Sequence, residues 1–370
     1  MSALAKIKNY FYDRYCIVSN FCSKKFNLIK KNIIWFCRLS FPLGKKAYLI
    51  GTPEYNNIGD SAICLAEMKF LSKSGFAKRR IKEISTSEYF MYRTFIKKYI
   101  SRSSLICGLG GGNMGNHWYD EELLRYEIID DFKDNPMIIF PQTIFYTDDA
   151  DGKKAKKESV KYYDSCKKLC MIAREKKSFS LMSSLYKKAD ILLTPDIVLS
   201  TNKDTFEIET KSRSGILLCM RSDKEKILSK NDILNIEVYL KERGQYYKFI
   251  DMYSECDTIN KKNRLKYTKK KLEEFANARL VITDRLHAMI FSAITETPCI
   301  VFDNCNYKIS GTYEWIKYLD YIKYVDDAGN LNYLQSLIDD MLNRESCKFD
   351  NEPLCIYFDK ISEVIKSYVN

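Results

Sequence analysis

The stretch LVITDRLHAMIF at residues 280–291 joins a short apolar strand directly to a helix. Residues 280–283 have the composition of a buried strand, and the helix is expected to begin near Arg285. The same change from a short apolar run to a helical pattern recurs along most of the chain. Strands separated by helices are typical of parallel crossover units, so the sequence predicts a doubly wound α/β fold.

The repeated pattern divides into two halves on either side of a polar segment at residues 201–214. The strands expected in the first half are 47–51, 104–108, 137–140, 169–173 and 191–193, with helices at 61–71, 120–132 and 177–187. Those expected in the second half are 215–220, 247–250, 280–283 and 299–302. We therefore expect a leader at 1–46, Rossmann-like domains at 47–205 and 213–345, and a C-terminal helix at 346–370. Two such domains predict a GT-B-like arrangement with the active site in the cleft between them.

The net charge of +12 is concentrated at the N-terminus of the 370-residue chain. Residues 1–46 contain ten Lys or Arg and one Asp, with Tyr, Phe and Ile between them. Such a basic aromatic leader suits an anionic membrane surface, and the alternative is a solvated basic helix packed on the body. Its apolar run at 33–37 is too short to span a bilayer, and no nucleic-acid-binding motif follows it. We expect a cytoplasmic protein without a nucleic-acid partner, whose leader favours peripheral attachment to the inner face of the membrane.

The 13 cysteines are scattered, and the N-terminus lacks the pattern of a secretory signal. A disulfide framework is therefore not expected. Cys166 and Cys170 are four residues apart, but no second pair or histidine lies near them in the sequence, so a zinc site is not expected either. Asp149 and Asp151 resemble a metal-binding pair, yet the lysines that follow favour a solvated loop. The sequence predicts no metal site.

Arg285 and His287 are the strongest candidates for chemistry. They lie where a strand ends and a helix begins, so free backbone N–H groups and the helix dipole favour an anion there. A guanidinium can grip a carboxylate or a phosphate with two hydrogen bonds, and an imidazole can move a proton near neutral pH. The alternative is a capping histidine beside a surface arginine.

Two further cations follow expected strands. Arg174 comes directly after the strand at 169–173, and Lys308 lies in the loop after the strand at 299–302. Either residue alone is weak evidence, because most Lys and Arg side chains are solvated. Together with Arg285 they predict a site for a small ligand that carries several negative charges.

The run GLGGGNMG at residues 108–115 holds five of the 14 glycines and follows an expected strand. It can bring the backbone close to a ligand, although a tight packing turn is the alternative. It is neither a Walker loop nor a dinucleotide fingerprint. His117, just after this loop, is a candidate substrate contact. In the first loop Asp60 is placed to cap the next helix, but capping alone does not explain so long a polar loop.

Taken together, these motifs resemble the polysaccharide pyruvyl transferase family over roughly residues 47–320. The matching segments, in the family's order, are Asn57-Ile58-Gly59-Asp60, Gly110-Gly111-Gly112-Asn113, Phe140-Pro141-Gln142-Thr143, Arg174-Glu175 with Ser178, Pro195-Asp196, Arg285-Leu286-His287, and the loop with Lys308 and Gly311. One departure is Glu175, where the family commonly has aspartate, and the charge is kept. The basic leader lies outside the resemblance.

The resemblance implies a GT-B-like fold and a phosphoenolpyruvate donor, whose pyruvate is transferred as a ketal to two hydroxyls of a sugar. The acceptor would belong to a surface polysaccharide, such as a capsule or exopolysaccharide, or to its lipid-linked precursor. Arg174, Arg285, His287 and Lys308 would hold the donor, and His287 would be the acid. Further substrate-binding positions would be Asn57, Asp60, Gly111, Gly112, Asn113, Gln142 and His117. The scheme requires no metal or other cofactor.

Two other functions fit the same fold. One is a nucleotide-sugar glycosyltransferase, although the sequence offers no convincing acidic residue for a ribose. The other is a membrane-associated assembly protein without catalysis, against which the retention of Arg174, Arg285, His287 and Lys308 argues.

Overall fold

The computed structural model describes residues 28–369 except 224 and 345. Its first half contains a seven-stranded parallel sheet in the order β2-β1-β3-β5-β6-β7, with β4 paired to β5. The strands are β1 (Ala47–Thr52), β2 (Ile81–Ser85), β3 (Leu105–Gly108), β4 (Gly111–Gly115), β5 (Pro136–Phe145), β6 (Lys168–Ala173) and β7 (Asp190–Leu193). The helices are α2 (Ile58–Lys73), α3 (Thr86–Tyr99), α4 (Tyr119–Phe132), α5 (Ala150–Tyr163) and α6 (Lys176–Leu185).

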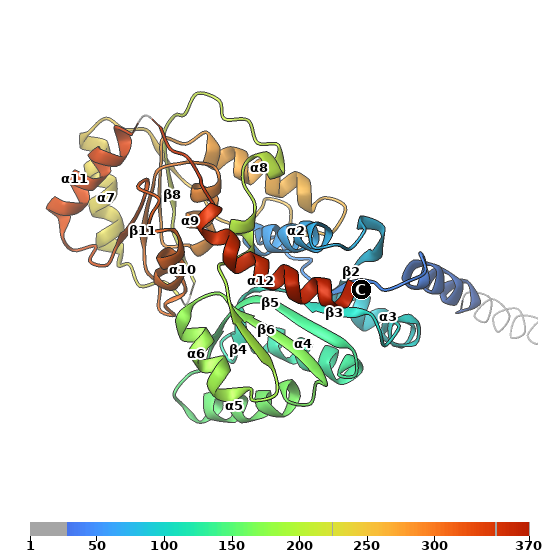
Figure 1. The fold of residues 1–370 in the computed structure, drawn as a ribbon. Coiled ribbons are helices and arrows are strands. Elements are labelled where there is room, and N and C mark those ends of the chain that lie inside the picture. Colours follow the sequence, from blue (N-terminus) through green and yellow to red (C-terminus); the bar gives the residue numbers. More distant parts are fainter. Residues whose placement is uncertain (1–27, 224, 345, 370) are drawn as a thin grey trace, which may run out of the picture.

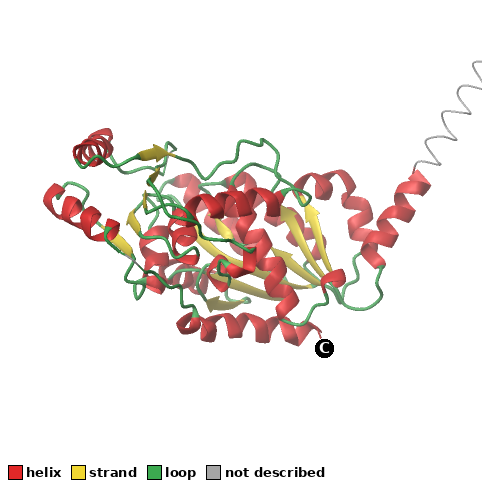
Figure 2. Ribbon diagram, turned by 90° about the horizontal axis from the view of Figure 1, so that it is seen from above, coloured by secondary structure: helices red, strands yellow, loops and turns green. Residues whose placement is uncertain are grey.

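The second half contains a five-stranded parallel sheet in the order β12-β11-β10-β8-β9. Its strands are β8 (Ile216–Cys219), β9 (Tyr247–Phe249), β10 (Leu280–Thr283), β11 (Cys299–Phe302) and β12 (Ile322–Val325). The helices are α7 (Lys230–Glu242), α8 (Arg264–Ala276), α9 (Leu286–Ile294), α10 (Lys308–Ile316), α11 (Leu331–Leu342) and α12 (Glu352–Val369). Helices flank the strands on both sides (Figures 1 and 2). The fold is therefore the predicted α/β architecture of two doubly wound parallel sheets, and it is GT-B-like.

One of the two apolar core clusters spans both halves of the chain. This cluster of buried side chains contains Leu49 and Ile63 from the first half, Leu218 and Phe291 from the second, and Phe358 from the last helix. Helix α12 crosses back to the first half, where Phe358 packs on Phe70 of α2 with 6.1 Å between ring centroids (Figure 1). This packing fixes the carboxyl ends of the two sheets relative to each other.

Three parts of the sequence analysis need correction. The pairs β2–α3 and β12–α11 were not predicted. The glycine run was expected to be a loop, but Gly111–Gly115 forms strand β4 and pairs with β5. The segment around Asp149 was expected to be a solvated loop, but Asp149 caps helix α5 by accepting a hydrogen bond from Gly152 N at 2.8 Å.

The described part of the leader forms a helix at residues 28–40 that stands at the edge of the body (Figures 1 and 2). It packs on α3 through Trp35 against Tyr92 and Phe36 against Tyr99, with ring centroids 4.8 and 5.4 Å apart. Residues 1–27 of the predicted leader lie outside the described residues, and membrane association stays a prediction. Within the described part of the chain, no helix is both long and apolar enough to cross a membrane.

Candidate active site

A pocket of about 350 Å³ lies between the two sheets, at their carboxyl ends. In each sheet the strand order reverses between two neighbouring strands, β1 and β3 in the first and β8 and β10 in the second. Ligands of doubly wound folds bind at such switch points. The loops after these strands supply much of the lining: Tyr55, Asn57, Asp60 and Gly112 from the first half, with Arg221, Glu225, Arg285 and His287 from the second.

Arg174 is held rigidly at the end of β6. Its Nη1 lies 2.8 Å from Asp196 Oδ2, and both side chains are 1% exposed. Its Nε donates a hydrogen bond to Thr143 Oγ1 at 2.8 Å. The remaining nitrogen, Nη2, faces Gly112, where a Cβ would lie only 2.5 Å away. Glycine at 112 therefore leaves room for this guanidinium beside the pocket.

Lys308 and Arg221 share one buried carboxylate. Glu225 Oε2 lies 2.6 Å from Lys308 Nζ and 2.6 Å from Arg221 Nη2. Arg221 also bonds Asp223 through Nε and Nη2, at 2.9 and 2.8 Å. Burial lowers the pKa of Lys308 to about 8, although Glu225 opposes that shift. Lys308 is therefore still largely charged at neutral pH.

Arg285 is the N-cap residue of α9. The sequence pattern of residues 280–291 predicts a helix that begins near this residue. Its Nη2 lies 2.8 Å from Asp251 Oδ1, and its guanidinium lies 5.5 Å from the centroid of the Tyr253 ring. The four pocket cations thus each have a carboxylate partner in the described structure. An incoming anion has to share these cations with carboxylates that already orient them.

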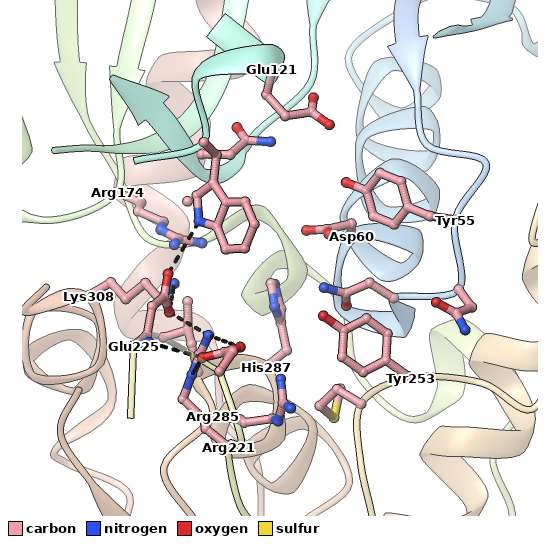
Figure 3. A pocket seen from close by; sticks show the side chains of 18 residues that line it. Tyr55, Asp60, Glu121, Arg174, Arg221, Glu225, Tyr253, Arg285, His287 and Lys308 are labelled. Atoms are coloured by element: carbon pink, nitrogen blue, oxygen red, sulfur yellow. Dashed lines mark hydrogen bonds and ion pairs between the residues drawn. The ribbon is translucent and has the colours of Figure 1, made fainter. Parts of the chain in front are cut away.

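His287 lies at the centre of the pocket (Figure 3). Its Nε2 has no hydrogen-bond partner among the described residues, and the nearest carboxylate oxygen, Asp196 Oδ2, is 3.9 Å away. Burial lowers the pKa of His287 to about 4. The sequence-based expectation that this imidazole titrates near neutral pH is therefore wrong. A bound anion would raise this pKa, because it favours the charged imidazolium.

The ring of His287 packs directly on the backbone of Gly59. A Cβ at residue 59 would lie 2.3 Å from His287 Nδ1, far inside van der Waals contact. The glycine in the motif Asn57-Ile58-Gly59-Asp60 is therefore required by the position of the imidazole.

We expect Gly59→Ala to lower turnover about 100-fold, because a displacement of roughly 1 Å at a reacting group costs that much. The double variant with His287→Ala should be no slower than His287→Ala alone, since the clash disappears with the ring. Gly329→Ala, on an exposed loop where a Cβ would meet only the flexible Asp327 side chain, is the matched control. Steady-state turnover of the four proteins decides the matter, and simple additivity of the two losses would contradict it.

Most of the predicted site residues line the pocket: Asn57, Asp60, Gly112, Asn113, Arg174, Arg285, His287 and Lys308. Three do not. Gln142 is fully buried and donates to Leu109 O at 2.7 Å, which orders the glycine segment that contains Gly111. His117 packs edge-on against the rings of Phe145 and Trp118 beside the pocket.

Asp60 was expected to cap α2, and this is wrong. The N-cap of α2 is Asn57, whose side chain accepts a hydrogen bond from Gly59 N at 2.9 Å. Asp60 lies in the first turn and lines the pocket. Burial raises its pKa to about 6, and the nearby Glu121 adds to the rise.

Several lining residues escaped the sequence analysis, notably Tyr55, Glu121, Arg221, Glu225 and Tyr253. Arg221 carried a usable signal, because it follows an expected strand as closely as Arg174 does. The others lie on loops or helix starts whose direction the sequence pattern does not reveal. Among the described residues, no group of three or more His, Cys, Asp or Glu side chains is placed to hold a metal ion.

Comparisons with known proteins indicate the family and the fold. The family model for polysaccharide pyruvyl transferase matches residues 57–306, a range that ends two residues before Lys308. General stress protein 30 of Bacillus subtilis is 34% identical over 319 residues, which cover 85% of this chain and 91% of that protein. Pyruvyl transferase 1 of Schizosaccharomyces pombe is 29% identical over 274 residues, covering 70% of this chain and 66% of that protein. A solved structure of an uncharacterised Klebsiella pneumoniae protein aligns with a TM-score of 0.54 at 18% identity, over 82% of this chain and 98% of that one, which shows a shared fold alone.

Proposed function

Because the chain belongs to the polysaccharide pyruvyl transferase family, we propose that it transfers pyruvate from phosphoenolpyruvate to a sugar. The pyruvate becomes a ketal on two hydroxyls of a surface polysaccharide or of its lipid-linked precursor. The observation that carries this proposal is the convergence of Arg174, Arg285 and Lys308 around His287 in one pocket.

The chemistry of the donor matches these groups. Phosphoenolpyruvate carries a carboxylate and a phosphate, and charge-assisted hydrogen bonds from Arg and Lys bind both well. Arg174 Nη2 and His287 Nε2 have no hydrogen-bond partner among the described residues. Their neighbours Asp196 and Gly59 hold these two side chains in place before a ligand arrives. Such preorganisation favours stabilisation of charge as it develops in the reaction.

His287 is the proposed acid. Ketal formation requires a proton at the donor's methylene carbon, which leaves an electron-poor carbon that a sugar hydroxyl attacks. Because burial keeps the imidazole neutral at neutral pH, we propose that it gains its proton when the anionic donor binds. The proton donor is then charged only when there is substrate to protonate.

We expect the protein to bind phosphoenolpyruvate in the presence of a chelator, because four cationic side chains line the pocket. Isothermal titration calorimetry with and without EDTA measures this, with UDP-sugars as the comparison ligands. Equal dissociation constants for phosphoenolpyruvate in both buffers and no heat from UDP-sugars are the expected result. Binding of a UDP-sugar in place of phosphoenolpyruvate would overturn the proposal in favour of a glycosyltransferase, and loss of binding in EDTA would show that a metal is needed.

A further inference from the structure

The pocket has two chemically different sides. In Figure 3, Arg174 and Lys308 lie to the left of His287 and Arg285 lies below it, while Asp60 lies to the right. Tyr55 and Tyr253 stand beside Asp60, and Glu121 projects from above. The second side, which we call the carboxyl wall, is formed by Tyr55, Asp60, Glu121 and Tyr253. Tyr253 stands where the two sides meet, because its ring centroid lies 5.5 Å from the guanidinium of Arg285.

The carboxyl wall is already assembled in the described structure, although its residues come from both halves of the chain. The loop that carries Tyr55 and the loop that carries Tyr253 are joined by a bridge between Asn57 and Tyr253. Ile58 N also donates to Met252 O at 2.9 Å. Neither tyrosine therefore depends on a ligand to bring it to the pocket.

No structural role accounts for the carboxyl group of Asp60. Asn57 caps the helix, and among the described residues Asp60 forms no ion pair. Its interaction partner is the hydroxyl of Tyr55. The charges of Lys308 and Arg174 offset the cost of burying Asp60 only in part, because burial still raises its pKa to about 6. A carboxyl group buried at such a cost beside a pocket is better explained by a function.

The carboxyl wall suits a neutral molecule that is rich in hydroxyls. Carboxylates accept hydrogen bonds from hydroxyl groups, whereas two carboxyl groups would repel a phosphate or a second carboxylate. The residues Tyr55 and Tyr253 are 39% and 44% exposed, and a tyrosine side chain offers an apolar ring face together with a polar hydroxyl. These properties match the alternating C–H and O–H surface of a sugar.

We propose that the carboxyl wall is the acceptor subsite and that Asp60 takes the proton from the sugar hydroxyl that attacks the donor. This inference rests on the proposed pyruvyl transfer. It adds a second catalytic residue, across His287 from Arg174 and Lys308, and assigns the two tyrosines to the sugar ring.

The protons balance in this scheme. The first hydroxyl oxygen bonds to C2 of the donor, its proton passes to Asp60, and the methylene carbon gains a proton to become a methyl group. The second hydroxyl oxygen then bonds to C2 while the C–O bond to phosphate breaks, and phosphate leaves with the bonding electrons. Two hydroxyl protons are lost, one equivalent to that gained by the methyl group and one carried away by phosphate.

We expect Asp60→Asn to lower the turnover of pyruvyl transfer by about 10²–10⁴-fold, the range of general base catalysis. Its dissociation constant for phosphoenolpyruvate should stay within about threefold of wild type or become smaller, because a negative charge is removed. Asp120→Asn, an exposed carboxylate in the same turn as Glu121, is the matched control and should behave as wild type.

The pH profile separates a base from a structural residue. A base acts when deprotonated, so wild-type kcat/KM for the acceptor should fall as the pH drops through about 6, the pKa of Asp60. Asp60→Asn should lack this acid limb in its residual activity. Tyr55→Ala should raise the acceptor KM and leave phosphoenolpyruvate binding unchanged.

The assays are calorimetry with phosphoenolpyruvate and phosphate release with nitrophenyl hexosides and N-acetylhexosaminides. Near-normal transfer by Asp60→Asn would overturn the inference alone, and so would a loss of phosphoenolpyruvate binding beyond about tenfold, which would place Asp60 with the donor. A wild-type protein that does not bind phosphoenolpyruvate would instead overturn the proposed function. If no panel sugar reacts, the calorimetric arm still decides on which side of the pocket Asp60 acts.

Discussion

Replacing His287 with alanine is expected to lower turnover by about 10²–10⁴-fold and to weaken phosphoenolpyruvate binding far less. The reason is that protonation of the methylene carbon occurs in the transition state, whereas binding of the donor rests mainly on the cationic side chains. Arg285→Ala should differ by weakening donor affinity as well, because it removes a charge-assisted hydrogen-bond donor. His117→Ala should have the smallest effect, since His117 lies beside the pocket against Phe145.

Proton uptake offers a second readout for His287 that does not depend on an acceptor. Burial lowers the pKa of His287 to about 4, so the imidazole is neutral at pH 6 to 7. If the bound donor raises this pKa past the buffer pH, the complex must take up a proton from solution. Calorimetry of phosphoenolpyruvate binding in buffers of different ionisation enthalpy measures that uptake.

We expect uptake of up to one proton by the wild type and less by His287→Ala. Equal uptake by the two proteins would show that another group, such as Asp60, takes the proton. Near-normal turnover of His287→Ala, or a larger loss for His117→Ala, would refute the assignment of His287 as the acid. Thermal melting of each variant excludes unfolding as the cause.

The fold could be predicted because strands and helices alternate along the chain with clear apolar runs. Residues 280–291 form the predicted strand β10 and helix α9, and Arg285 lies at the junction. The glycine segment was mistaken for a loop because glycine has low strand propensity, while here pairing with β5 outweighs that propensity. Strand β2 and the helix α3 that follows it were missed because two of the five residues of β2, Lys82 and Glu83, are charged.

The lining of the pocket could be predicted only where it follows directly from chain position. Arg174, Arg285 and Lys308 could be found because each follows a strand end, and parallel strands bring such ends to one edge. Partners could not be predicted, because they depend on contacts between distant segments. Glu225 between Arg221 and Lys308 is one case, and Asp196 beside Arg174 is another. The effect of burial on the pKa of His287 was missed for the same reason.

Arg174→Ala is expected to damage both stability and donor binding. The ion pair with Asp196 is almost completely buried, with 1% exposure on each side chain. Removing one partner of such a pair leaves an uncompensated buried charge and costs about 3–5 kcal/mol of the free energy of unfolding. Arg243→Ala is the control, because its ion pair with Asp339 is exposed to solvent and should contribute little to stability.

Arg174→Lys separates the two roles of this side chain. A lysine ammonium keeps the positive charge beside Asp196, so much of the lost stability should return. It lacks the fixed fork with which the guanidinium reaches Thr143, Asp196 and the pocket at once, so donor affinity should stay low. Urea unfolding gives the stability of each variant, and calorimetry gives its dissociation constant for phosphoenolpyruvate. An Arg174→Ala protein that is destabilised yet binds phosphoenolpyruvate normally would reduce Arg174 to a structural residue, and the donor site would then have to be built on Arg285, Lys308 and Arg221.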